Sequence, residues 1–95
     1  MKPLKSFLTE EFIEDLATRS YFRYGKGIVK DGDVTMLEQN TFNLIAKVKH
    51  GDGQTRTVKL ESTPKGFKYK CTCSNRKDLF CQHCVAVGLW GSENL

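Results

Sequence analysis

The sequence predicts an α+β fold: an N-terminal helix, a small antiparallel β-meander and a C-terminal helix. Three observations predict this class. Apolar residues recur at helical spacing after Thr9, apolar and polar residues alternate from Phe42 onward, and a short apolar segment follows Cys81. With 95 residues, the chain is expected to form a single domain over residues 1–95, and a metal site would supplement its modest core.

A helix is predicted over residues 9–27, after a loose lead-in over residues 1–8. Thr9 is a suitable N-cap, and the two glutamates that follow it suit the positive end of a helix dipole. The glycines at positions 25 and 27 are expected to end this helix. Its apolar side chains at helical spacing are Phe12, Ile13, Leu16 and Ala17.

An antiparallel meander is predicted over residues 34–73. Residues 34–39 are expected to form a short strand, and a hairpin follows around the turn at residues 51–53. A second turn at residues 62–66 leads into a last strand that begins at Phe67. The apolar positions that alternate along these strands are Phe42, Leu44, Ala46, Val48, Val58, Leu60, Phe67 and Tyr69.

The four cysteines of the chain and one of its two histidines lie between Cys71 and Cys84. Cys71 and Cys73 fall on one face of the predicted last strand, with Cα atoms about 6.6 Å apart. This spacing suits two thiolates that bind one metal ion, and it lies near the upper limit for a disulfide. Metal binding is therefore favoured over disulfide pairing.

The second ligand pair is left open by the residues themselves. In a helix, Cys81 and Cys84 would share a face because they are three residues apart. Cys81 and His83 would point in nearly opposite directions, unless Cys81 precedes the helix in an extended conformation. Two ligand sets therefore remain: three cysteines with His83, or four cysteines.

The spacing Cys71-Thr-Cys73, then seven residues, then Cys81-Gln-His83 before an apolar helix resembles a SWIM-type zinc finger, here over residues 71–90. The pattern of that family is also matched by Tyr24, Gly27, Val29, Ala86 and Leu89. The resemblance implies one structural Zn²⁺ ion that joins the sheet to the last helix. The implied ligands are Cys71, Cys73, Cys81 and His83.

The same resemblance implies that Cys84 is a buried helix residue, and that the module binds DNA or another protein. Bacterial members of the family are associated with Swi/Snf-type ATPases, which is compatible with a place in a larger DNA-remodelling protein. No enzymatic activity is expected. Four protein ligands leave no open position on the zinc ion, and no Asp or Glu stands out as a general base.

The formal net charge is +4, which falls to about +3 once three thiolates hold one zinc ion. Because side chains alternate between the two faces of a strand, five lysines are expected on the outer face of the predicted sheet. Two further cationic residues follow the first cysteine pair. These candidate nucleic-acid-binding residues are Lys47, Lys49, Lys59, Lys68, Lys70, Arg76 and Lys77. We expect weak, non-specific binding of nucleic acid and no small-molecule substrate. The alternative is a protein–protein interaction module in which the charge serves only solubility.

The sequence also predicts a compartment. No stretch of the chain approaches the roughly eighteen apolar residues of a membrane span. The apolar run at the N-terminus breaks too early for a signal peptide. Together with the closely spaced cysteines, these features predict a cytoplasmic protein that makes no membrane contact.

Overall fold

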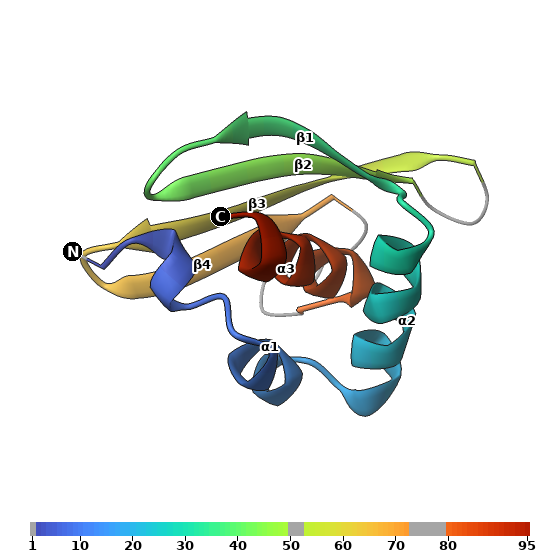
Figure 1. The fold of residues 1–95 in the computed structure, drawn as a ribbon, viewed down its shortest axis with the longest axis horizontal. Helices are drawn as coiled ribbons and strands as arrows, with labels where there is room; N and C mark the ends of the chain where they lie inside the picture. The colour runs from blue at the N-terminus through green and yellow to red at the C-terminus, as the bar shows by residue number, and fades with distance from the viewer. Residues whose placement is uncertain (1, 50–52, 73–79) are drawn as a thin grey trace.

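The computed structural model describes residues 2–49, 53–72 and 80–95. Within these ranges it has the α+β fold that the sequence predicts, with a four-stranded antiparallel sheet and three α-helices. Figure 1 shows these helices on one side of the sheet, so they leave its other side uncovered. The elements are η1 (Leu4–Ser6), α1 (Glu10–Leu16), α2 (Arg19–Lys30), β1 (Val34–Gln39), β2 (Asn43–Lys49), β3 (Thr55–Thr63), β4 (Gly66–Cys71) and α3 (Gln82–Asn94).

The sheet is a meander with the strand order β1-β2-β3-β4. Its register pairs Leu44 with Leu60 and Ala46 with Val58, so these four side chains share the buried face. The predicted alternation on the hairpin is therefore confirmed. On β4, the aromatic residues and Cys71 are half-buried and alternate with exposed lysines, as predicted for this part of the last strand.

α3 is the central helix of the domain. Every residue from His83 to Leu89 is buried, because the sheet covers one side of the helix while α1 and α2 cover the other (Figure 1). A helix enclosed in this way is apolar nearly all round instead of amphipathic. Even so, no helix within the described ranges combines the length and the apolar content that crossing a bilayer requires.

The single helix predicted over residues 9–27 is wrong, because the structure has two helices there. Ala17 has an extended backbone (φ −96°, ψ 161°) and ends α1. The Thr18 hydroxyl then accepts a hydrogen bond from the N–H of Tyr21 and caps a new helix, α2. α2 continues through both glycines and ends before Gly32, whose φ of 74° suits a residue without a side chain.

The loose lead-in predicted over residues 1–8 is also wrong for the residues that the structure describes. Leu4 is 0% exposed and Leu8 is 3% exposed, so both belong to the core. The N–H of Leu4 donates a hydrogen bond to the carbonyl of Thr41 over 2.8 Å, which ties η1 to the β1–β2 turn. A single 3₁₀ turn is too short to carry a periodic pattern, so the spacing of apolar residues does not reveal it.

Gly25 allows α2 and α3 to approach closely. A Cβ atom at this position would lie 2.3 Å from Cγ1 of Val85 and 3.0 Å from the carbonyl oxygen of Gln82. Only a residue without a side chain fits there. A Cβ atom added to Gly27, two residues later in the same helix, would meet no packed neighbour within 4 Å.

Gly25→Ala is expected to lower the free energy of unfolding by about 1–3 kcal/mol, because the added methyl group pushes α2 away from α3. Gly27→Ala is the matched control. It is expected to raise the free energy of unfolding by up to about 1 kcal/mol, since alanine favours a helix and meets open space here. Chemical denaturation of both variants measures the two effects, and equal effects would contradict the close approach at Gly25.

Candidate metal centre

Three of the predicted ligands converge at the start of α3. Cys71 is the last residue of β4, Cys81 directly precedes α3, and His83 lies in the first turn of that helix. Cys81 is extended (φ −77°, ψ 176°), which is the conformation that lets Cys81 and His83 point to one place. The candidate ligand atoms of Cys71, Cys81 and His83 all lie within 4.8 Å of one another. This group could therefore hold a metal ion.

An aromatic contact holds the two chain segments of the site together. The ring of Phe80 meets the ring of Tyr69 edge-to-face, with centroids 4.9 Å apart. Tyr69 lies two residues before Cys71, and Phe80 directly precedes Cys81, so the contact brings one ligand toward the other. The spacing of the cysteines and the histidine does not identify Phe80 as part of the site. The one feature of the sequence that points to Phe80 is its position directly before Cys81, and a pattern made only of ligand residues does not include that position.

The spacing of the ligand atoms matches that of a tetrahedral metal site. Nδ1 of His83 lies 3.7 Å from Sγ of Cys71 and 3.6 Å from Sγ of Cys81. Sulfur and nitrogen ligands of a tetrahedral zinc ion, at about 2.3 and 2.0 Å from the metal, lie about 3.5 Å from each other. A metal ion of this kind therefore fits among the three side chains with little movement of any of them.

The pKa shifts within the cluster favour the binding of a metal cation. Hydrogen bonds from the side chains of Cys71 and Cys84 lower the pKa of the Cys81 thiol well below its ordinary value, although burial opposes this shift. Burial lowers the pKa of His83, but hydrogen bonds and charges from Cys71 and Cys81 outweigh it and raise that pKa to about 9. These shifts favour the thiolate form of Cys81, which is the form that binds a metal ion, and a metal ion bound by His83 would displace a proton from its ring.

Cys84 stands outside the group of three. It is fully buried in the first turn of α3, and its Sγ atom lies 3.9 Å from Sγ of Cys81. Hydrogen bonding to Cys71 and Cys81, together with burial, raises the pKa of its thiol. Cys84 is therefore a neutral thiol beside the cluster, in the role of a small buried hydrophobic residue.

Cys84→Ser is expected to leave one metal ion bound per chain and to lower the free energy of unfolding by about 1–2 kcal/mol, because a hydroxyl group is less suited to a buried apolar position. Elemental analysis of the purified variant and a denaturation curve check the two parts of this prediction. Loss of the metal from Cys84→Ser would instead place Cys84 among the ligands and support the four-cysteine set.

Three of the predicted site residues, Cys73, Arg76 and Lys77, lie outside the described residues. The structure therefore describes three of the four ligands that the SWIM resemblance implies. It also describes five of the seven candidate nucleic-acid-binding residues, and all five have exposed side chains. These five are Lys47, Lys49, Lys59, Lys68 and Lys70.

The five lysines share the uncovered outer face of the sheet, as strand parity predicts. The register places Lys59 directly opposite Lys70 on the neighbouring strand. Like charges in directly opposite positions destabilise a sheet. Glu61 lies opposite Lys68, and its carboxylate is 3.8 Å from Nζ of Lys59, so one acid stands among these three lysines. This part of the outer face is therefore positively charged.

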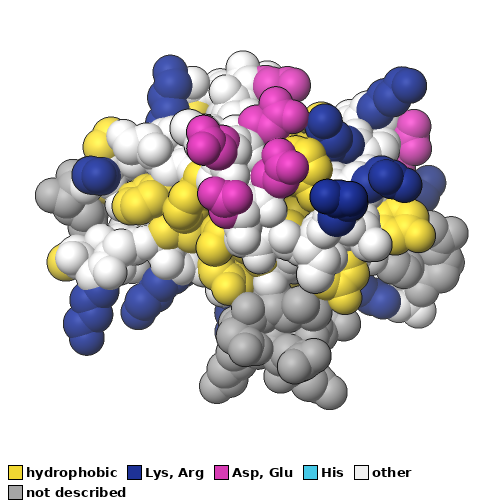
Figure 2. All heavy atoms as spheres, turned by 90° about the horizontal axis from the view of Figure 1, so that it is seen from below, with side chains coloured by type: hydrophobic (Ala, Val, Ile, Leu, Met, Phe, Trp, Pro, Cys, Tyr) yellow, Lys and Arg dark blue, Asp and Glu magenta, His cyan; other side chains and the backbone are white. Residues whose placement is uncertain are grey.

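The helix side of the molecule carries separate acidic and basic areas. Figure 2, which looks onto this side, shows Asp and Glu side chains gathered beside a group of Lys and Arg side chains. Nζ of Lys26 lies 3.2 Å from Glu10 and joins the two areas. The basic side chains of α2 thus stand beside acids that offset their charge. The exposed residues are Glu10, Glu11, Glu14 and Asp15 of α1 and Arg19, Arg23, Lys26 and Lys30 of α2.

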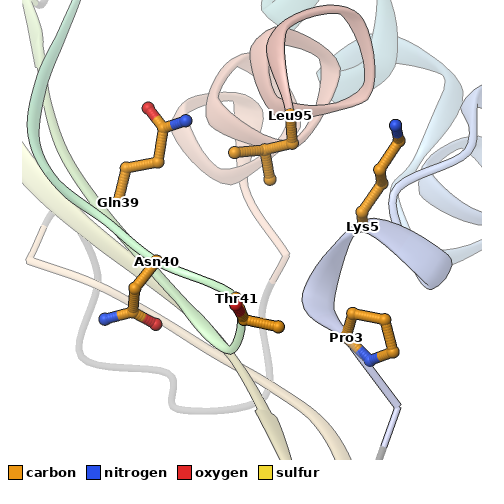
Figure 3. A pocket seen from close by; sticks show the side chains of 6 residues that line it. All are labelled: Pro3, Lys5, Gln39, Asn40, Thr41 and Leu95. Atoms are coloured by element: carbon orange, nitrogen blue, oxygen red, sulfur yellow. The ribbon is translucent and has the colours of Figure 1, made fainter.

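A pocket of about 320 Å³ lies among η1, the β1–β2 turn and the end of α3 (Figure 3). Lys5 is the charged side chain in its wall, and this residue is exposed. Among the residues that the structure describes, none of the predicted ligands and none of the predicted lysines lines the pocket. It is therefore separate from the metal cluster and from the basic face of the sheet.

The resemblance to SWIM-type zinc fingers rests on the spacing of Cys71, Cys73, Cys81 and His83 in the sequence. Comparison of the chain with family models, with curated proteins and with solved structures found no match. The candidate metal centre therefore rests on the convergence of its own side chains, Cys71, Cys81 and His83.

Proposed function

We propose that the chain is a zinc-stabilised, non-catalytic recognition module of the SWIM type that binds nucleic acid through the outer face of its sheet. The observation that carries the proposal is the convergence of Cys71, Cys81 and His83 at the edge of the core. Thiolates with an imidazole are a ligand set that Zn²⁺ prefers in structural sites. Paired thiolates of this kind persist in a reducing compartment, which favours the cytoplasm.

Cys73 is the fourth ligand in this proposal. It follows Cys71 by two residues in the sequence and lies outside the described residues, so its place among the ligands rests on the spacing that resembles a SWIM-type zinc finger. With four protein ligands, the ion has no open position for a substrate or a reactive water. Its role is then to fasten β4 to the start of α3, and the site supports a fold instead of a reaction.

The lysines of the outer sheet face supply the binding surface. Lys59 of β3 and Lys70 of β4 are directly opposite each other, so their positive charges repel. A bound anion would reduce this repulsion. The face carries no helix among the described elements, so a phosphate backbone has access to it (Figure 1). Flexible lysines on a sheet contact phosphates without reading base edges, so we expect little sequence preference.

Titration of labelled single-stranded DNA, double-stranded DNA and RNA with the zinc-loaded protein tests the proposal. We expect binding at about 20 mM salt, where charges are least screened, and a steep loss of affinity at about 150 mM. No binding to any of the three probes at the lower salt would remove the nucleic-acid function. A protein partner would then be the function to test, with the zinc site unaffected.

A further inference from the structure

We propose that Cys81 and Cys84 are an oxidation site, at which hydrogen peroxide converts one metal ligand and its neighbouring thiol into a disulfide and so releases the metal. The inference rests on the metal centre proposed above. It gives a chemical role to Cys84, which that centre does not use as a ligand.

The two sulfur atoms are already close. Sγ of Cys81 lies 3.9 Å from Sγ of Cys84, and a disulfide bond is about 2.05 Å long. The residues form a Cys-X-X-Cys pair at the start of a helix, with Cys81 before α3 and Cys84 in its first turn. Pairs in this position are the ones that form and break disulfides readily.

The burial of the two cysteines limits which oxidants can reach their sulfur atoms. Cys81 is 2% exposed and Cys84 is 0% exposed. A bulky disulfide such as oxidised glutathione needs in-line access to a sulfur atom, and neither residue offers it. Hydrogen peroxide is small and uncharged, so it reaches such a site through a brief local opening at the start of the helix.

The chemistry is balanced with peroxide as the oxidant. The Cys81 thiolate attacks one oxygen of hydrogen peroxide, the O–O bond breaks, and a sulfenic acid forms while hydroxide leaves and takes up a proton. The Cys84 thiol then attacks the sulfenic sulfur, the S–O bond breaks, and water leaves as the S–S bond forms. Two sulfur atoms lose two electrons in total, and one peroxide molecule becomes two molecules of water.

Metal release follows from the loss of a ligand. The thiolate is the form of cysteine that binds a metal ion, and a disulfide sulfur carries no such charge. The remaining ligands hold the ion less tightly, so it passes to a competing chelator. Reduction of the disulfide restores the Cys81 thiolate, which makes the release reversible. Without Cys84, the sulfenic acid goes on to sulfinic acid, which common reductants do not reverse.

Peptide mapping of the wild-type protein tests the pairing directly. The zinc-loaded protein is treated with hydrogen peroxide, alkylated and digested with trypsin, which cuts after Arg76 and Lys77. A bond between Cys81 and Cys84 leaves the peptide over residues 78–95 two hydrogen atoms lighter and free of alkylation. A bond between Cys71 and Cys73 would alter the peptide over residues 71–76, and a bond between the pairs would join the two peptides. Either of these as the main product would overturn the proposal.

Recovery of zinc supplies the second measurement. After peroxide, wild-type protein given dithiothreitol and zinc is expected to regain most of its metal. Cys84→Ala, first shown to bind one zinc ion, is expected to regain little and to carry two added oxygen atoms on Cys81. Full recovery in Cys84→Ala would contradict the role of Cys84. Absence of zinc from the untreated wild type would count against the metal centre instead, so the two failures are distinguishable.

Discussion

Replacing Cys81 or His83 with alanine is expected to remove the proposed zinc ion and to unfold the domain. Cys81 is 2% exposed and His83 is 1% exposed, and both stand at the start of the central helix. α2 packs chiefly on α3, and the inner face of the sheet packs on α3 as well. A metal ion held by these residues would therefore fasten the element on which the rest of the core depends.

The size of the effect follows from the coupling of metal binding to folding. A structural zinc ion contributes about 10–16 kcal/mol of apparent binding free energy at neutral pH. The whole stability of a typical domain is about 5–15 kcal/mol. Loss of the ion thus removes an amount comparable to the entire stability, and a strong chelator should have the same effect as either substitution.

Far-ultraviolet circular dichroism, the fluorescence of the single tryptophan, Trp90, and elemental analysis measure the fold and the metal together. Cys84→Ser is the matched control, because it alters a buried sulfur beside the cluster but is expected to keep the metal. If His83→Ala kept its zinc and its fold while Cys84→Ser lost both, the ligand set would be the four cysteines. If the metal-free protein stayed folded, the coupling itself would be wrong.

The sheet was predictable because its signal is local. Alternation of apolar and polar residues identifies both the strands and their buried face, and residues 34–39 form a strand as predicted. The division of the first helix was missed for a different reason. Thr18 is a good cap, but it lies within a run that still has helical spacing, so the pattern alone does not place the break. The prediction that the glycines end the helix was wrong, because Gly25 allows close packing of α2 on α3 and lies inside the helix.

The candidate metal site was predictable in its residue types more than in its geometry. The spacing of the residues predicts Cys71, Cys81 and His83 as ligands. Whether the side chains of Cys81 and His83 converge depends on the backbone conformation of Cys81 alone. No pattern in the sequence predicts the extended backbone of Cys81. The packing of Phe80 on Tyr69 favours it, and that contact joins residues far apart in the chain. The nearness of Cys81 and Cys84, by contrast, is local, because the two residues are three apart at the start of one helix.

Neutralising three lysines on the outer face of the sheet is expected to remove most of the affinity for single-stranded DNA. Lys59, Lys68 and Lys70 lie on adjacent strands, and the register sets Lys59 directly opposite Lys70. If about four cations contact the strand, the slope of log K against log salt concentration is about −3 for the wild type. Loss of three contacts should bring that slope to about −1.

The substitutions are Lys59→Gln, Lys68→Gln and Lys70→Gln, made together. Glutamine removes the charge while it keeps a long polar side chain, and the repulsion between Lys59 and Lys70 disappears. We therefore expect the fold and the zinc content to be unchanged. Fluorescence anisotropy over a series of salt concentrations measures both the affinity and the slope.

The matched control changes Arg19, Arg23 and Lys30 of α2 to glutamine, which alters the net charge by the same amount on the helix side of the molecule. On the helix side of the molecule, Figure 2 shows Lys and Arg side chains beside Asp and Glu side chains, which repel phosphates, and Lys30 lines one pocket together with Glu10. The control is expected to keep the wild-type slope and to lose only the affinity that net charge supplies. Equal losses in the two variants would mean that binding is a diffuse effect of charge. A greater loss in the α2 variant would move the binding surface from the sheet to the helices.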